Sequence, residues 1–549
     1  MRIWFVLCLA LASLSIPTYG EPPPQDPDEA AEAPAEQAEE RPGEEQELET
    51  PFDVLRNERL TGDWWGARRW LEDHGVTIDL GLTTIYQHNA KGGLRTYNAH
   101  RVSGSYDLEL TLDTAAMGLF KGGTVYAYAT GGWDWGVSPY VGDLLGVNDD
   151  IEGQQEIYLP ELWYEHSFLE NRLRVRLGKL DLSVDFDTSQ FANDSTAQFL
   201  NSGLVNTGNV PLPDPGHGVQ FVATPWDWLY FAAGVVDAEA NVLETGFRTA
   251  YHGPRDLFSI YEFGLTPAFD TPWGQLPGNY RFGMWYDPQP KEKFFNSRDD
   301  RIRHAPLKRD DTGFYLSFDQ AVWRENPATE EDEQGVGWFF RYGYAHGDVN
   351  TIEHFWSTGA QYLGLIPTRD EDVLGFGVAQ GILSEDLRLT KADPHRETAL
   401  ELYYNIKLLP WLTLSPDFQW ILRPGGEHGR DAFVAACASR RHSEPRRVSA
   451  DPSREREQAN RTPRSRASRS PHSLTACSAN TGVHTMQRSW RWKCLVATLS
   501  TIPLLGATCA TAVRDAIESG ALDFVTGTVT EVLTRTVPVA DTVVPVAEE

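Results

Sequence analysis

The sequence has no run of about 20 consecutive apolar residues, so it encodes no helix that could cross a bilayer. Basic residues are also in deficit, because 48 Lys and Arg stand against 78 Asp and Glu, giving a formal net charge of −30. Phosphate backbones repel a chain this acidic, which argues against nucleic acid as a partner. A helical membrane protein and a nucleic-acid-binding protein are therefore both excluded.

Cysteine is missing between residues 21 and 436, although the chain contains 5 in total. The five positions are Cys8, Cys437, Cys477, Cys494 and Cys509. Exported soluble domains often depend on disulfides, whereas a transmembrane β-barrel satisfies its backbone through its own hydrogen-bonded ladder. The gap in cysteine usage favours the barrel.

Catalytic and metal-binding motifs are also missing. The chain has no Gly-x-Ser-x-Gly, His-Glu-x-x-His or phosphate-loop sequence, and its 14 His are scattered without ligand spacing. We therefore expect binding chemistry alone, with no enzymatic activity, no cofactor and no metal.

The N-terminus carries an export signal. Arg2 precedes an apolar stretch over 3–16, and the small residues Thr18 and Gly20 follow, which predicts a cleaved signal peptide over 1–20. A buried first helix is the alternative. Residues 21–50 contain twelve acidic residues and one basic residue, so we expect an acidic, disordered leader there.

Alternation of polar and apolar residues dominates the region from 76 to 436. Arg172 to Leu177 is the clearest case, with three arginines on one face and three aliphatic residues on the other. Such segments are about ten residues long, the length of a tilted transmembrane strand. The expected strands are 76–87, 105–113, 123–133, 156–168, 172–182, 217–224, 228–236, 259–267, 279–288, 312–323, 335–346, 354–364, 373–383, 397–408, 412–421 and one that begins at 431.

Connections after odd-numbered strands are mostly long and those after even-numbered strands mostly short, as in outer-membrane barrels. The predicted fold is therefore all-β, a transmembrane barrel of about 16 antiparallel strands over 76–436. Residues 51–75 form an N-terminal helical segment, with a helix from Thr61 to His74 that Thr61 or Asp63 caps and Gly75 stops. An amphipathic helix lying in the membrane interface is the alternative.

Three separated motifs resemble one known family. They lie at 60–76, which contains Leu-Thr-Gly-Asp-Trp-Trp-Gly-Ala-Arg, at 185–201, and at 409–426. Together they resemble the carbohydrate-selective porin family OprB over about residues 52–436. The resemblance implies a sixteen-stranded channel in the outer membrane of a Gram-negative-type bacterium, glucose-type solutes that diffuse passively, and an N-terminal helix at the periplasmic mouth.

A hairpin around Glu170-Asn171 would place Glu165 opposite Arg176 and Trp163 opposite Gly178, on the face that points into the barrel. An aromatic ring beside paired charges suits the C–H faces and hydroxyls of a neutral polyol. The alternative is that these charges only hydrate the wall. The expected pore-lining residues are Glu161, Trp163, Glu165, Arg172, Arg174 and Arg176. Lys179 falls on the lipid-facing parity, so we expect a bulge there or the end of the membrane.

The connection 183–216 is long enough to fold inward and narrow the pore, although a surface loop is the alternative. Its candidate constriction residues are Asp185, Asp187, Asn193, Asp194, Gln198 and Asn201. The expected partners are small carbohydrates and outer-membrane lipid, and assembly with further copies of the chain stays open. Two other functions also stay open: a secreted, soluble glycan-binding or glycan-cleaving β protein, and a general or anion-preferring porin.

The composition changes after residue 436. Residues 437–485 contain ten Arg but no Lys and no aromatic residue, and Met486 opens a second signal-like segment within 486–549. Alternation also stops near Ala436, so the last strand is expected to be incomplete. We interpret 437–485 as a frameshifted tail and 486–549 as a separate reading frame, with a true C-terminal extension as the alternative.

Resequencing the locus tests this interpretation. We expect a single-base change near codon 436 to restore an alternating strand that ends in an aromatic residue. A confirmed frame, together with a peptide from 440–480 detected in membranes, would contradict it.

Overall fold

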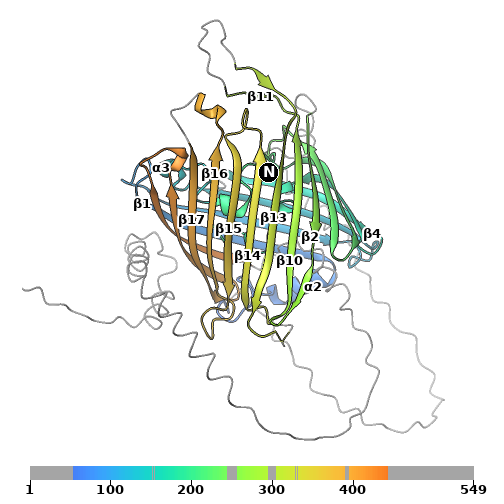
Figure 1. Ribbon diagram of the computed structural model, residues 1–549. Helices are drawn as coiled ribbons and strands as arrows, with labels where there is room; N and C mark the ends of the chain where they lie inside the picture. Colours follow the sequence, from blue (N-terminus) through green and yellow to red (C-terminus); the bar gives the residue numbers. More distant parts are fainter. Residues whose placement is uncertain are drawn as a thin grey trace, which may run out of the picture. The chain divides into compact units, whose positions relative to one another are not determined.

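The protein, described here by a computed structural model, forms a closed antiparallel β-barrel (Figure 1). The structure describes residues 53–442, apart from 151–152, 154, 244–255, 295–304, 328, 330–331 and 390–394. Sixteen strands of this part make up the barrel, as the alternation predicted. They are β1 (Val76–Lys91), β2 (His100–Asp113), β3 (Gly123–Trp133), β4 (Gln155–Phe168), β5 (Leu173–Leu180), β6 (Gly216–Trp226), β7 (Leu229–Asp237), β8 (Leu257–Leu265), β10 (Gly274–Asp287), β13 (Asp311–Arg324), β14 (Gly335–Ala345), β15 (Ile352–Leu363), β16 (Val373–Leu383), β17 (Arg396–Leu409), β18 (Leu412–Leu422) and β19 (Ala432–His442).

Three short strands add to this set. Strand β9 (Ala268–Thr271) continues β8 beyond Pro267 along the same partner, β10. Strands β11 (Lys291–Glu292) and β12 (Leu307–Lys308) pair with each other in the connection between β10 and β13. Proline cannot donate to a ladder, which is why β8 is interrupted at Pro267.

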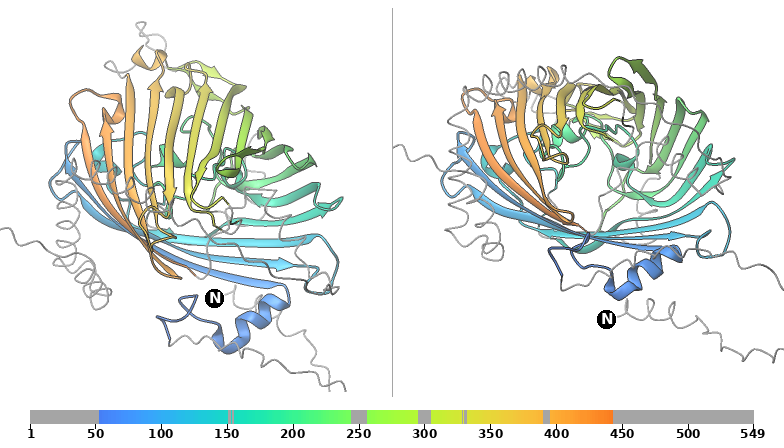
Figure 2. Two further views of the ribbon diagram at one scale, coloured as in Figure 1. Left: turned by 60° about the horizontal axis from the view of Figure 1, so that its bottom comes forward. Right: turned by 90° about the horizontal axis from the view of Figure 1, so that it is seen from below.

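The barrel closes where the first strand meets the last (Figure 2). Strand β1 pairs with β2 on one edge and with β19 on the other, in a register from Gly81 opposite His442 to Lys91 opposite Phe433. Closure leaves neither β1 nor β19 with an open edge, so their backbone groups are satisfied as a bilayer requires.

The two faces of the wall differ in chemistry. Large exposed side chains on the outer face include Leu80, Leu108, Leu177, Phe231 and Trp420. The inner face is mainly polar, with Glu, Arg, Asp, Gln and Ser side chains buried against the contents of the barrel. This arrangement follows from the period of two, since alternate residues on a strand face opposite sides of the sheet.

The N-terminal helix is α2 (Ala67–Asp73), preceded by a single 3-10 turn, η1 (Trp64–Gly66). It is shorter than expected. Its N-cap is Gly66, whose backbone is left-handed with φ 89°, and Gly75, with φ +79°, follows its C-terminal end. Asp63 still supports the first turn, since its Oδ1 accepts the backbone N–H of Arg69 at 3.1 Å. Both views of Figure 2 place α2 beside the strand wall, outside the ring.

The interior of the barrel is partly filled by its own connections. The segment between β3 and β4 carries α3 (Ser138–Val141), and that between β5 and β6 carries η2 (Leu182–Val184) and α4 (Ser202–Val205). Both pack apolar side chains against the inner wall, as Leu145 and Leu204 do with Phe355 and Tyr403. Two further turns, η4 (Asp386–Leu389) and η5 (Pro424–Gly426), lie in later connections. No helix among the described residues is long and apolar enough to span a membrane.

The last strand corrects the expected end of the barrel at 436. Strand β19 continues to His442 and pairs on both sides, so it is not incomplete. The alternation was missed because Ala436 and Ala438 face inward while Cys437 and Ser439 face outward, and such small residues give little contrast between faces. Because residues 437–442 belong to β19, a frameshifted tail would begin after His442 and not at 437. Residues 443–549, like the signal peptide and the leader, lie outside the described residues.

Strand β19 leads to a truncation prediction. A chain that ends after His442 should fold, whereas one that ends after Ala436 should not, because Gly81–Tyr86 of β1 and Leu412–Pro416 of β18 would lose their partners. Each unsatisfied backbone group in a bilayer costs several kcal/mol. Heat-modifiable migration in unboiled gels measures folding, and equal migration of both truncations would contradict the prediction.

Candidate functional site

A cavity of about 610 Å³ lies inside the barrel between the wall of β2–β5 and the connection from β5 to β6, residues 181–215. Aromatic, acidic and basic side chains line it together. The wall contributes Glu109, Thr111, Thr124, Tyr126, Tyr128, Thr130, Tyr158, Pro160, Glu161, Trp163, Glu165, Arg174 and Arg176, and the connections contribute Asp149, Asp150, Asp181, Ser183, Val184, Asn193, Asp194, Ser195, Val205, Asn206, Asp214, Pro215 and Val242.

The hairpin of β4 and β5 has the register that the sequence predicted. Glu165 lies opposite Arg176, and Trp163 lies opposite Gly178. The turn between the strands is tight, with Leu169, Glu170 and Asn171 all at positive φ. A short turn leaves only one register that keeps the aliphatic residues of β5 outside.

Trp163 lies between a tyrosine and an arginine. Its ring stacks on Tyr126 of β3, with centroids 4.9 Å apart, and the guanidinium of Arg176 from β5 is 4.0 Å from its centroid. Its Nε1 donates to Glu161 at 2.9 Å. Trp163 therefore lines the cavity with two neighbours already in contact with its ring, which the sequence did not suggest.

Arg176 is the centre of the charged part of this wall. Its guanidinium donates to Glu165, with Nε 3.1 Å from Oε2, and forms an ion pair with Asp185 of the 181–215 connection. Arg174 lies 3.8 Å from the same glutamate. Fixed partners of this kind hold donors and acceptors in one geometry.

Arg172 lies elsewhere. It is exposed at the turn that precedes β5, and its Nη1 donates to the carbonyl of Pro225 at 2.7 Å. The structure therefore does not bring Arg172 to the cavity, because the barrel wall ends before this residue.

The 181–215 connection folds inward, and its six candidate residues divide into two groups. Asn193 and Asp194 line the cavity, and Asp185 contacts the wall through Arg176. The remaining three serve the fold of the connection itself. Asp187 accepts from the backbone of Thr207, Gln198 accepts from the backbone of Asn193 and Asp194, and Asn201 accepts from that of Gly203 and donates to Gln419.

Inward-facing charged side chains on distant strands form hydrogen bonds with the backbone of this connection. They were not among the residues predicted from the sequence. Glu401 of β17 accepts the backbone N–H groups of Leu200 and Asn201 at 2.6 and 2.9 Å. Arg341 of β14 donates to the carbonyls of Leu204 and Ala192 at 2.8 and 2.7 Å. Their only signal in the sequence is a charge on the inward parity of a strand, which hydrated pore residues share.

The connection between β3 and β4 is held in the same way. Glu397 accepts the backbone N–H groups of Leu144 and Leu145, each at 2.9 Å. Burial raises the pKa of Asp143 in this connection to about 6. Burial also raises the pKa of Asp187 in the 181–215 connection, against the lowering effect of Arg341.

Lys179 breaks the parity of β5, as the sequence indicated. Its Nζ is buried and donates to the carbonyls of Leu159 and Val242 at 2.9 and 2.7 Å. The register between β3 and β4 shifts between Tyr128 and Thr130, so Leu159 lies in an irregular part of β4. The charge is thereby kept out of the lipid.

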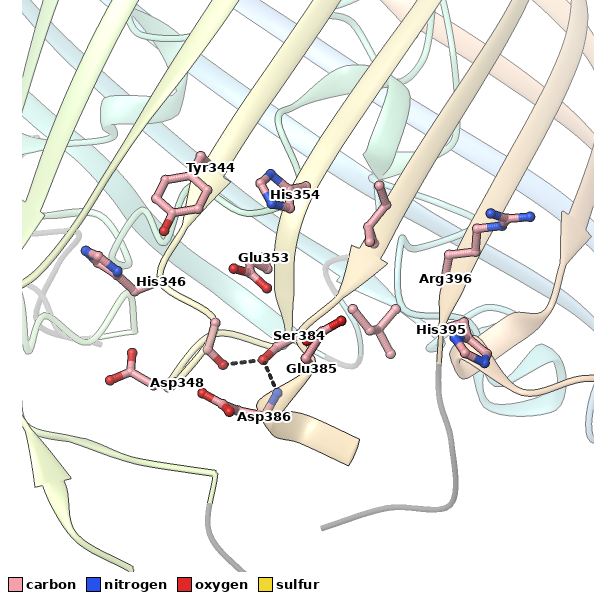
Figure 3. Close-up of a pocket in the computed structure, with 13 residues that line it drawn as sticks. Tyr344, His346, Asp348, Glu353, His354, Ser384, Glu385, Asp386, His395 and Arg396 are labelled. Carbon is pink, nitrogen blue, oxygen red and sulfur yellow. Dashed lines mark hydrogen bonds between the residues drawn. The ribbon is translucent and has the colours of Figure 1, made fainter. Parts of the chain in front are cut away.

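A second cavity, of about 690 Å³, lies where β14–β17 meet their long connections (Figure 3). Tyr344, His354, Ile382 and Arg396 line it on the outward parity of their strands, so it opens away from the barrel interior. Within the described part of the chain, no group of three His, Cys, Asp or Glu could hold a metal ion. The outward position of these four side chains sets this cavity apart from the one beside β2–β5.

Comparison with known proteins agrees with this geometry. Porin B of Pseudomonas aeruginosa is 22% identical over 413 residues, which cover 69% of this chain and 89% of that protein. The putative porin QuiX of Acinetobacter baylyi is 22% identical over 439 residues, covering 72% and 96%. The high-pH structure of Pseudomonas putida OprB has a TM-score of 0.62 at 21% identity, covering 71% of this chain and 99% of that one.

The family model described as carbohydrate-selective porin, OprB family, matches residues 98–440. This match spans more than half of the chain and includes every barrel strand from β2 to β18. The chain belongs to the OprB family of carbohydrate-selective porins.

Proposed function

We propose that small uncharged, glucose-type sugars cross the outer membrane passively through this barrel and contact the wall of β3–β5 on the way. The observation that carries the proposal is the stack of Tyr126, Trp163 and Arg176 beside the cavity. Membership of a carbohydrate-selective family supports the solute class, and no chemical step is part of the proposal.

The wall offers both kinds of contact that a sugar uses. The aromatic rings of Tyr126 and Trp163 suit the C–H groups of a sugar, and charged oxygens and nitrogens suit its hydroxyls. Glu165 and Arg176 already neutralise each other, so they can exchange hydrogen bonds with a neutral solute without setting a strong field of one sign. A neutral polyol therefore fits this wall better than an anion does.

A general or anion-preferring porin is the second candidate. The three arginines at 172, 174 and 176 suggest an anion, but Arg176 is paired with Glu165 and Asp185, and Arg172 lies away from the cavity. Carboxylates also outnumber guanidinium groups among the lining residues. These contacts favour a neutral solute over an anion.

Planar-bilayer recording tests the proposed function. Purified protein should form ion-conducting pores whose current falls as glucose-type sugars are added, because a bound sugar occupies the passage. The bulk conductivity of each sugar-containing solution corrects for the viscosity that the sugar adds. Pores that no monosaccharide or disaccharide blocks would leave only the general porin.

The variant Trp163→Ala tests the wall itself. It should weaken sugar block by up to about 1–3 kcal/mol, for which bases stacked on aromatic side chains give the upper limit. Val175→Ile is the matched control, because Val175 is on the same hairpin but on the outward parity, and it should leave the block unchanged. Unaltered block in Trp163→Ala would place the sugar on the 181–215 connection instead.

A further inference from the structure

One ion pair joins the pore-facing connection to the final strand. Nη1 of Arg440 on β19 is 2.9 Å from Oδ2 of Asp194. The two side chains are 15% and 8% exposed. Arg440 lies on the inward parity between Thr83 of β1 and Thr413 of β18, which are both buried. The pair is thus well shielded from bulk water but lies beside the cavity that Asp194 lines.

The two carboxylate oxygens of Asp194 have different partners. Oδ2 receives Arg440, while Oδ1 accepts the backbone N–H groups of Thr196 and Ala197 at 2.9 and 3.0 Å. Gln198 closes the same turn by accepting the N–H groups of Asn193 and Asp194. A single carboxylate therefore both shapes the turn 193–198 and attaches it to the wall.

An apolar contact lies next to the ion pair. Leu200, two residues after the turn, is buried with Ile85 of β1 and with Ala436 and Ala438 of β19. The small alanine side chains leave room for Leu200 against the strand. Residues 436–440 thus form a seat for the connection, in the part of β19 where the sequence pattern is weakest.

We propose that Arg440 and Asp194 form a latch that holds the turn 193–198 against β19 and thereby sets the width and the charge of the passage. The proposal rests on the proposed function in placing the solute path along this cavity. Intact, the pair contributes no net charge to the cavity. If either partner is removed, the net charge at the passage changes by one, and the turn loses an attachment.

The latch predicts opposite changes in ion selectivity. Arg440→Ala removes the cation of the pair and should shift the zero-current potential in a KCl gradient toward cations. Asp194→Asn leaves the Arg440 guanidinium alone and should shift it toward anions. Both should increase open-channel noise, because the turn is less firmly held. The shifts should be larger at 0.1 M than at 1 M salt, since the Debye length falls from about 10 Å to about 3 Å.

Two further variants separate a latch from simple destabilisation. Arg440→Lys keeps the charge and should retain the original selectivity, and the double variant Arg440→Ala/Asp194→Asn should return to the original selectivity while staying noisy. Heat-modifiable migration confirms that each variant folds. If a single variant does not fold, the double variant and Arg440→Lys still test the proposal, because a latch requires the first to be noisy and the second quiet.

Arg441→Ala is the matched control. It removes the same charge from the next residue, but Arg441 lies on the outward parity, opposite Leu82 and Leu412. It should change neither selectivity nor noise. Equal shifts in Arg440→Ala and Arg441→Ala, or shifts of the same sign in Arg440→Ala and Asp194→Asn, would overturn the latch. Ion selectivity is measured without sugar, so pores indifferent to sugar would refute the proposed function and leave this test intact.

Discussion

The whole structure depends on satisfying every backbone hydrogen bond of a chain that lies in lipid. That requirement forces the sheet to close on itself, and closure depends on one pairing, between β1 and β19, which are the two ends of the barrel in sequence. An open edge would leave a row of N–H and C=O groups without water to replace the missing partner. The outward residues then need only be apolar. The inward residues are not needed for contact with lipid, so they can bind the connections and line the passage.

Several of the inward-facing charged side chains form hydrogen bonds with the backbone of the connections inside the barrel. Glu401, Arg341 and Glu397 each bind N–H or C=O groups of a connection that has only short helical turns of its own. A buried charge is costly when it is alone, and several directed hydrogen bonds offset that cost. The barrel interior is consequently divided between a packed region around Phe355 and Tyr403 and an open region beside β3–β5.

The fold could be predicted from the sequence because strands are local patterns. Two of the sixteen predicted ranges, those of β3 and β16, agree with the structure at both ends, and the short turn at Glu170 determines the register of β4 and β5. The last strand was predicted wrongly where alanine, serine and cysteine remove the contrast between its faces. The contents of the barrel could not be predicted, since the partner of Leu200 is a glutamate 201 positions away. The sequence predicted that Trp163 lines the barrel, but it did not predict that Tyr126 and Arg176 contact its ring.

Those neighbours bear on how quickly solutes can pass. The Trp163 ring and the Arg176 guanidinium already have partners within the protein, so on the proposed path a sugar would exchange existing contacts for new ones. Exchange of this kind binds weakly, and weak binding means short residence. A diffusion pore must bind each solute strongly enough for entry and weakly enough for release. A wall whose polar groups already bond to one another meets the second condition.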